Sequence, residues 1–335
     1  MRQRYNDLLK LTAGCFTKLN RKAFGKILRK NMSNFTHGEK TFDGLICSTT
    51  SGMKPAVIFL SALNFLLSFI AAAGNSLILI ALKKPSSLHP PSKVLLCSLA
   101  ASDLCVGLIL QPLVATLFAA VAIESKSLCR PMLGLSYPIG VVLFGVSLLT
   151  LTAISVERFL ALELGVRFRL VVSFRKILTL VICFWVLNVG MAALSVWNFL
   201  IFLWYGLMLI LTCVATSTLT YVKIYASLRR CQTVVHNQSL NEEENETRLN
   251  IVRFKKTVSC SVWILMTLLS CYLPYSIVTA LATHNGLTPS LVLGWRFTSS
   301  IVFLNSSLNP FLYCWKITEV RQAVKDTIRK LYLLD

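Results

Sequence analysis

The sequence predicts an all-α membrane protein, a bundle of seven transmembrane helices followed by a short amphipathic eighth helix. Two features of the 335-residue chain lead to this fold class. Hydrophobic residues make up 55% of the sequence and charged residues only 14%, well below the roughly 25% charge of a soluble domain. The apolar residues also form long runs, which is typical of segments that cross a bilayer.

Seven runs are long enough to cross the hydrocarbon core as helices. They cover residues 56–82, 93–120, 131–162, 176–197, 199–228, 256–282 and 290–315. Helices are expected because every backbone amide in lipid needs a partner within its own segment. A basic amphipathic stretch follows at 317–332. The expected organisation is an N-terminal segment (1–55), one bundle (56–316), and an amphipathic helix with a tail (317–335).

The basic residues lie mainly in one set of loops. The net charge is +20, with Lys and Arg between runs one and two, three and four, and five and six, and after run seven. The opposite loops hold only Lys126 and Arg130. Because basic loops stay in the cytoplasm, we expect the N-terminus outside and the C-terminus inside, in the plasma membrane. No soluble basic face suggests a nucleic-acid partner.

The first thirty residues contain nine Lys or Arg and one acid, Asp7, but no apolar run typical of a secretory signal. Two interpretations stay open. Residues 1–31 are a basic arm or organelle presequence, or translation begins at Met32 and they are missing from the mature protein. Under both, Asn34 lies in an N-x-T sequon on the expected outer side, where it is a glycosylation candidate.

Polar residues within the runs carry a family resemblance. Such residues are costly in lipid and mark functional sites. In chain order they are Gly74 and Asn75, Asp103, Glu157-Arg158-Phe159, Trp185, Tyr221, Tyr272 and Pro274, and finally Asn305, Asn309, Pro310 and Tyr313. This order, over about residues 56–332, resembles the rhodopsin-like class of G-protein-coupled receptors.

Asp103 needs polar partners, because an isolated charge is very costly in an apolar medium. Ser147, Asn305, Ser306 and Asn309 lie at matching depth in the sequence pattern. In the resembled family such a cluster holds a sodium ion, and oxygen ligands around one carboxylate suit a hard cation. The alternative is a hydrogen-bond network between helices without an ion. No other cofactor is expected.

The resemblance also implies a switch. Arg158 would pair with Glu157 at rest and then be released toward Tyr221 or a G protein. Prolines in runs six and seven are expected hinges, since proline breaks the helical ladder. The full set of expected switch residues is Glu157, Arg158, Tyr221, Tyr272, Pro274, Asn309, Pro310 and Tyr313. The simpler alternatives are an arginine that snorkels to the interface and prolines that only shape packing.

Cys129 stands near the position where the family forms a disulfide with the second outer loop. Runs four and five almost touch, and the loop between them contains no cysteine. Cys129 therefore lacks its usual partner, and two alternatives remain, a free thiol or a bridge to Cys47. The very short loop resembles the melanocortin, adenosine and cannabinoid receptor group.

The outer ends of the runs enclose a mostly apolar candidate ligand pocket. Gly140 stands where amine receptors have an aspartate, and Phe303 where opsins have the retinal lysine, so the resemblance argues against both ligands. Thr279 replaces an asparagine of adenosine receptors. A lipid-like or small apolar ligand, or a peptide at the mouth, is favoured. The candidate pocket residues are Gln111, Tyr137, Gly140, Thr279, Trp295 and Phe303, with Arg296 among the rim residues.

The leading hypothesis is a receptor that passes an extracellular ligand signal to a heterotrimeric G protein, surrounded by membrane lipids. One alternative is a non-signalling decoy receptor, because Phe159, Gly165 and Tyr272 depart from the family pattern. A seven-helix transporter is the less favoured alternative, since the sequence shows no internal repeat. We find no nucleophile–base pair or metal-ligand set that would indicate an enzyme.

Overall fold

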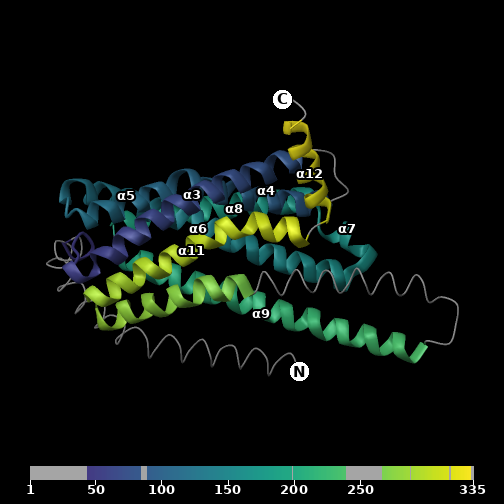
Figure 1. The fold of residues 1–335 in the computed structure, drawn as a ribbon. Helices are drawn as coiled ribbons and strands as arrows, with labels where there is room; N and C mark the ends of the chain where they lie inside the picture. The colour runs from purple at the N-terminus through teal and green to yellow at the C-terminus, as the bar shows by residue number, and fades with distance from the viewer. Residues whose placement is uncertain are drawn as a thin grey trace, which may run out of the picture.

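The computed structural model describes residues 44–83, 89–197, 199–238, 266–286, 288–316 and 318–332, and these form helices joined by short turns, with no strand among them. The long helices lie side by side (Figure 1), as the sequence predicts. The proposals for residues 1–43, Asn34 included, for the loop residues 239–255 and for the start of the sixth run at 256–265 fall outside the described residues.

Each span corresponds to one helix or to a few consecutive ones. The helix Met266–Asn285 carries no label in the figures. The labelled elements are η1 (Ser51–Met53), α3 (Lys54–Lys83), α4 (Pro90–Cys105), η2 (Val106–Leu110), α5 (Gln111–Ala122), α6 (Lys126–Leu164), η3 (Gly165–Arg167), α7 (Phe168–Val171), α8 (Phe174–Trp197), α9 (Phe199–Gln238), α11 (Pro289–Lys316) and α12 (Thr318–Tyr332).

Six of the described helical segments are both long and apolar enough to cross a membrane. The seventh, α11, has 28 residues, about 42 Å at 1.5 Å per residue, but it is more polar. Its polar residues are hidden in the bundle: Asn305, Ser306, Ser307 and Asn309 are each at most 2% exposed. The residues that lower the hydropathy of α11 are therefore those it presents to other helices.

The fourth and fifth spans meet almost without a loop, as predicted. Helix α8 ends at Trp197 and α9 begins at Phe199. The predicted end of the fifth span, residue 228, lies next to the end of the apolar span at Ser227, and helix α9 continues beyond it to Gln238. Residues 229–238 contain no Gly or Pro, so nothing in their backbone chemistry ends the helix where the apolar run stops.

The second span contains a π-helical turn, η2, between α4 and α5. Gly107 lies within it, and a Cβ on this residue would be 2.7 Å from the backbone nitrogen of Ala72 on α3. The missing side chain thus allows the two helices to approach closely. A π turn inserts an extra residue into the helical register, so α5 presents different faces from those that a regular helix would predict.

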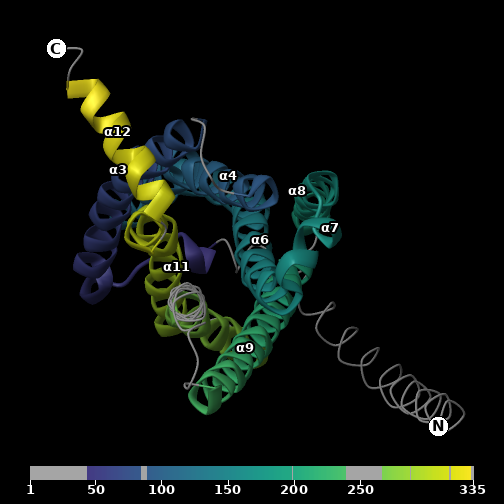
Figure 2. The ribbon, with the colours of Figure 1, turned by 90° about the vertical axis from the view of Figure 1, so that its right-hand side faces the viewer.

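Helix α6 is the centre of the bundle and packs against α4, α5, α8 and α9, whereas α3 packs against α4, α5 and α11. Large apolar side chains face outward, among them Phe69, Val186 and Leu219, each more than 60% exposed. This pattern suits a lipid environment. Helix α12 turns away from the bundle axis (Figure 2), and its Val320 and Val324 are buried in the core cluster.

Candidate functional site

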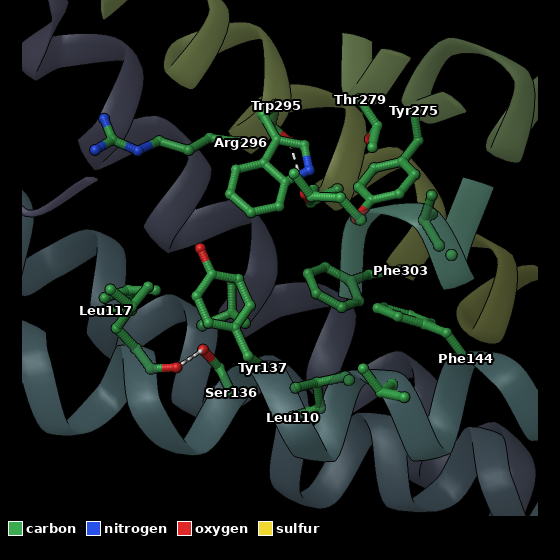
Figure 3. A pocket seen from close by; sticks show the side chains of 18 of the residues that line it. Leu110, Leu117, Ser136, Tyr137, Phe144, Tyr275, Thr279, Trp295, Arg296 and Phe303 are labelled. Carbon is green, nitrogen blue, oxygen red and sulfur yellow. Dashed lines mark hydrogen bonds between the residues drawn. The ribbon is translucent and has the colours of Figure 1, made fainter. Parts of the chain in front are cut away.

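A cavity of about 140 Å³ opens between α5, α6, α9, the helix Met266–Asn285 and α11. Most of its lining is aliphatic or aromatic (Figure 3). Tyr137 stacks on Trp295 with ring centroids 5.8 Å apart, and Phe144 lies 5.1 Å from Phe303. The hydroxyl of Tyr275 lies close to the side chains of Trp295 and Thr279. The cavity therefore offers aromatic faces and few polar groups.

The sequence-derived pocket residues mostly lie in this lining. Tyr137, Gly140, Thr279, Trp295 and Phe303 all line the cavity. Gln111 does not. It is fully buried outside the lining, and its side-chain amide has no hydrogen-bond partner among the described residues. It follows directly after the π turn, which rotates α5 so that other residues of the second span face the cavity.

A short stretch of the N-terminal segment covers the mouth of the cavity. Cys47 is disulfide-bonded to Cys129 on α6, which is the second of the two alternatives left open by the sequence. Arg296 on α11 donates hydrogen bonds from Nη2 to the carbonyls of Ile46 at 2.6 Å and Ser48 at 3.2 Å. Ile46 itself lines the cavity. Residues 46–48 thus form a roof that is tied to α6 and α11. We call this end of the bundle the cavity end.

One further ion pair lies at the cavity end. Lys54, at the start of α3, approaches Glu124 between α5 and α6 to 2.6 Å. A hydrogen bond from the ammonium and its charge hold the pKa of Glu124 below its usual value. Both side chains are exposed, so the pair contributes little to stability.

Asp103 is fully buried in the middle of the bundle and accepts hydrogen bonds from three side chains on two helices. Its Oδ1 accepts hydrogen bonds from Ser306 at 2.7 Å and Ser147 at 3.2 Å, and its Oδ2 accepts one from Asn309 at 2.6 Å. Ser102 and Ser147 share a hydroxyl contact of 2.8 Å. The carboxylate on α4 therefore links α6 to α11, and we call these residues the Asp103 cluster.

Asn305, which the sequence also placed around Asp103, points elsewhere. Its side chain meets the hydroxyl of Tyr272 on the helix Met266–Asn285. The proline in the expected hinge of α11 contacts α3, since a Cβ on Gly74 would be 2.9 Å from Cγ of Pro310. Asn75 donates to the carbonyl of Ser306 at 3.0 Å. The seventh span thus contacts the first, second and sixth directly, and it is linked to the third through Asp103.

Arg158 lies at the opposite end of α6, which we call the arginine end. Its Nε is 4.0 Å from Oε2 of Glu157, the outer limit of an ion pair. The other oxygen of Glu157 accepts a hydrogen bond from Ser92 on α4. No contact between Arg158 and Tyr221 is found. Instead, Lys223 stands 5.6 Å from the ring centre of Phe159, in a cation–π contact that joins α9 to α6.

The sequence reasoning did not identify two polar contacts, those of Ser92 and Asn188. Asn188 on α8 is fully buried, and its Oδ1 accepts a hydrogen bond from Tyr205 on α9 at 2.8 Å. An asparagine within the apolar fourth run was a usable signal, because such residues are costly in lipid. Ser92 offered no signal, since a serine near a membrane edge is unremarkable.

Comparison with known sequences and folds decides the family. A family model described as 7 transmembrane receptor (rhodopsin family) matches residues 74–201 and 194–313, most of the chain. The chain belongs to the rhodopsin family of seven-transmembrane receptors. The receptor is therefore a multi-pass membrane protein of a signalling family, and such family members work with an extracellular ligand and a G protein rather than as enzymes.

Individual relatives agree with this assignment. Adenosine receptor A3 of Ovis aries is 27% identical over 291 residues, covering 78% of the receptor and 86% of that protein. Adenosine receptor A3 of Bos taurus is 26% identical over 307 residues, covering 82% and 91%. Squid rhodopsin shares the fold with a TM-score of 0.68 at 15% identity, covering 83% of the receptor and 87% of that chain. The predicted seven-helix fold is confirmed.

Proposed function

We propose that the receptor transmits the binding of a ligand in the cavity to a heterotrimeric G protein at the arginine end. The observation that carries this proposal is the Asp103 cluster, which ties α4, α6 and α11 together between the two ends. A buried polar network that joins several helices suits two alternative arrangements, and a ligand shifts their populations by binding one of them better. Outward movement of the helix Met266–Asn285 would then open the arginine end.

The cavity end faces outside the cell in this proposal. Lys83, Lys93, Arg167 and Arg175 lie at the other end of the bundle, as expected for residues of cytoplasmic loops. The disulfide between Cys47 and Cys129 lies at the cavity end, and disulfides persist in oxidising, extracellular surroundings. Charge and redox chemistry therefore support the same orientation.

The Asp103 cluster fits a sodium ion. Asp103 has no cationic group within ion-pair distance among the described residues, and the hydroxyl oxygens of Ser147, Ser306 and Ser102 gather around it. One carboxylate with neutral oxygen groups suits a hard monovalent cation. A sodium ion held by Asp103 and these hydroxyls would neutralise the buried charge and favour the arrangement in which it is bound.

The resting contact of Arg158 is weak. Glu157 is 4.0 Å away and shares its carboxylate with Ser92. A long, partly exposed ion pair adds little stability, so we infer that Arg158 readily leaves Glu157 to contact a G protein. We therefore expect the receptor to have measurable activity without ligand. Such ligand-independent activity can be measured while the ligand is unidentified.

The test is recruitment of G proteins to the receptor in living cells, read by energy transfer between labelled partners. Wild type is compared with Arg158→Ala and with Arg175→Ala, which removes an exposed arginine at the same end. We expect ligand-independent recruitment by wild type and by Arg175→Ala, and at least tenfold less by Arg158→Ala at equal surface expression. Equal signals from all three, for every G-protein class, would contradict the proposal and favour a decoy receptor.

The relatives are named for adenosine, which makes a nucleoside the second candidate ligand. The cavity gives it limited support, because Thr279 stands where the resemblance places an asparagine and Thr279 already contacts Tyr275. Adenosine and inosine belong in the same recruitment assay as comparison ligands.

A further inference from the structure

Arg296 is a buried cation without an acidic partner. The residue is 5% exposed, and no Asp or Glu among the described residues lies within 4.0 Å of it. Its Nη2 donates hydrogen bonds to two backbone carbonyls, those of Ile46 and Ser48. Taking a cation out of water is costly unless a counter-charge compensates it. Arginine is also the side chain best shaped to hold a carboxylate with two parallel hydrogen bonds.

The same arginine lines the cavity. In Figure 3 its side chain extends to one side beside Trp295, whereas Phe144 and Phe303 lie at the opposite side. The cavity therefore has a charged end and an aromatic end. Its volume of about 140 Å³ is close to that of an engineered apolar cavity of about 150 Å³ that binds benzene. A ligand with a body of about one ring fits this volume.

The charges around the mouth favour an anion. Lys126 and Arg130 are exposed near the start of α6, beside Cys129. Among the described residues at the cavity end, the one acidic side chain is Glu124, and Lys54 neutralises it. A basic rim around a cavity raises the local concentration of anions.

We propose that the cavity binds a compact monocarboxylate with an apolar, preferably aromatic, body. The carboxylate pairs with Arg296 at the charged end, and the body packs between Tyr137, Trp295, Phe144 and Phe303. Arg296 keeps its contact with the roof at residues 46–48, so ligand binding and the roof position are coupled through one side chain. This proposal names the ligand of the receptor proposed above, and in that respect it rests on the proposed function. The binding experiment itself does not require signalling.

The experiment measures ligand-induced thermal stabilisation of the purified full-length receptor in lipid nanodiscs. The probes are 3-phenylpropionate and indole-3-propionate, with octanoate as an aliphatic body. The matched controls are 3-phenylpropanamide, which keeps the body without the charge, acetate, which keeps the charge without the body, and phenyl phosphate, which changes the anionic head. We expect saturable stabilisation by the aryl carboxylates, at least tenfold weaker binding of the amide, and none by acetate. Tighter binding of phenyl phosphate than of the carboxylates would overturn the choice of a carboxylate head.

Variants locate the binding site. Arg296→Gln should weaken 3-phenylpropionate at least tenfold, and Arg296→Lys should restore part of the affinity. Because Arg296 also holds the roof, a second variant leaves it untouched. Gly140→Leu fills the cavity from α6, where the atoms nearest to an added Cβ belong to Phe144 and Leu110 and lie at ordinary contact distances, and should abolish binding. Arg175→Gln, which removes an exposed arginine at the arginine end, should leave the affinity unchanged.

Three results would overturn the inference: equal binding of the amide, unchanged binding by folded Gly140→Leu, or no stabilisation by any carboxylate. These outcomes are separable from failure of the receptor hypothesis. Carboxylate binding without Arg158-dependent recruitment of G proteins would support the site and contradict signalling. Arg158-dependent recruitment without carboxylate binding would do the reverse.

Discussion

Gly145 on α6 lies directly against the side-chain amide of Asn188 on α8. A Cβ on Gly145 would be 1.6 Å from Oδ1 of Asn188. The same oxygen accepts the hydrogen bond from Tyr205 on α9, and Nδ2 of Asn188 donates to the carbonyl of Phe184 at 2.7 Å. Because Gly145 has no side chain, α6 can pack directly against Asn188 while Asn188 keeps its hydrogen bonds on α8 and to α9.

The first prediction follows from this contact. Gly145→Ala should destabilise the receptor by about 3 kcal/mol, because the added methyl group overpacks the interface and displaces Asn188 from its partners. Thermal unfolding of the purified protein in detergent measures the effect. The control is Gly190→Ala on α8, where a Cβ meets no atom within 4 Å. Equal melting temperatures for the two variants would contradict the contact.

The second prediction concerns the roof over the cavity. Cys47→Ser and Cys129→Ser should each destabilise the receptor by about 2–4 kcal/mol, the usual contribution of a disulfide. The double variant should match the single variants, because all three lack the same bond. Cys183→Ser, which removes an exposed free cysteine, should melt like wild type. Additive losses in the double variant would show that the two residues act separately.

The third prediction tests sodium at the Asp103 cluster. Wild type should melt at a higher temperature in sodium chloride than in choline chloride of the same ionic strength, because an ion that binds the folded state stabilises it. Asp103→Asn keeps the size of the side chain but removes the charge, and should melt equally in both salts. A sodium effect of the same size in Asp103→Asn would place the ion elsewhere. No sodium effect in wild type would mean that the cluster is a hydrogen-bond network without an ion.

The fourth prediction tests the orientation. If the N-terminus is outside, the sequon at Asn34 reaches the glycosylation machinery. The receptor expressed in animal cells should then shift to lower apparent mass on treatment with an N-glycosidase, and Asn34→Gln should abolish the shift. A shift that persists in Asn34→Gln points to another acceptor. A protease added to intact cells should remove an N-terminal tag and spare a C-terminal one, and the reverse pattern would contradict the orientation.

Sequence patterns predict the features that depend on length and composition. The position of each span follows from its apolar run, and the near contact of α8 and α9 follows from the absence of a polar loop between the two runs, which Asn198 alone separates. The bridge from Cys47 to Cys129 was one of two alternatives, since the short loop offers no other cysteine. These features need no knowledge of how each helix is rotated.

Side-chain partners depend on that rotation, and here the sequence is insufficient. Asn305 and Ser306 are adjacent and differ by about 100° around a helix of 3.6 residues per turn, so a small rotation decides which one meets Asp103. Ser306 does. Gln111 left the cavity because of the π turn before it, which no hydrophobic period reveals. The contact of Arg296 with residues 46–48 joins segments about 250 positions apart, beyond any local pattern.

The most direct measurement of the central claim is nucleotide exchange on purified heterotrimeric G proteins by the receptor in nanodiscs. The account predicts that wild type accelerates uptake of a non-hydrolysable GTP analogue above empty nanodiscs for at least one G-protein class, that Arg158→Ala removes the acceleration, and that Arg175→Ala retains it. Uptake by Arg158→Ala equal to that of wild type, or no acceleration by wild type for any class, would contradict it.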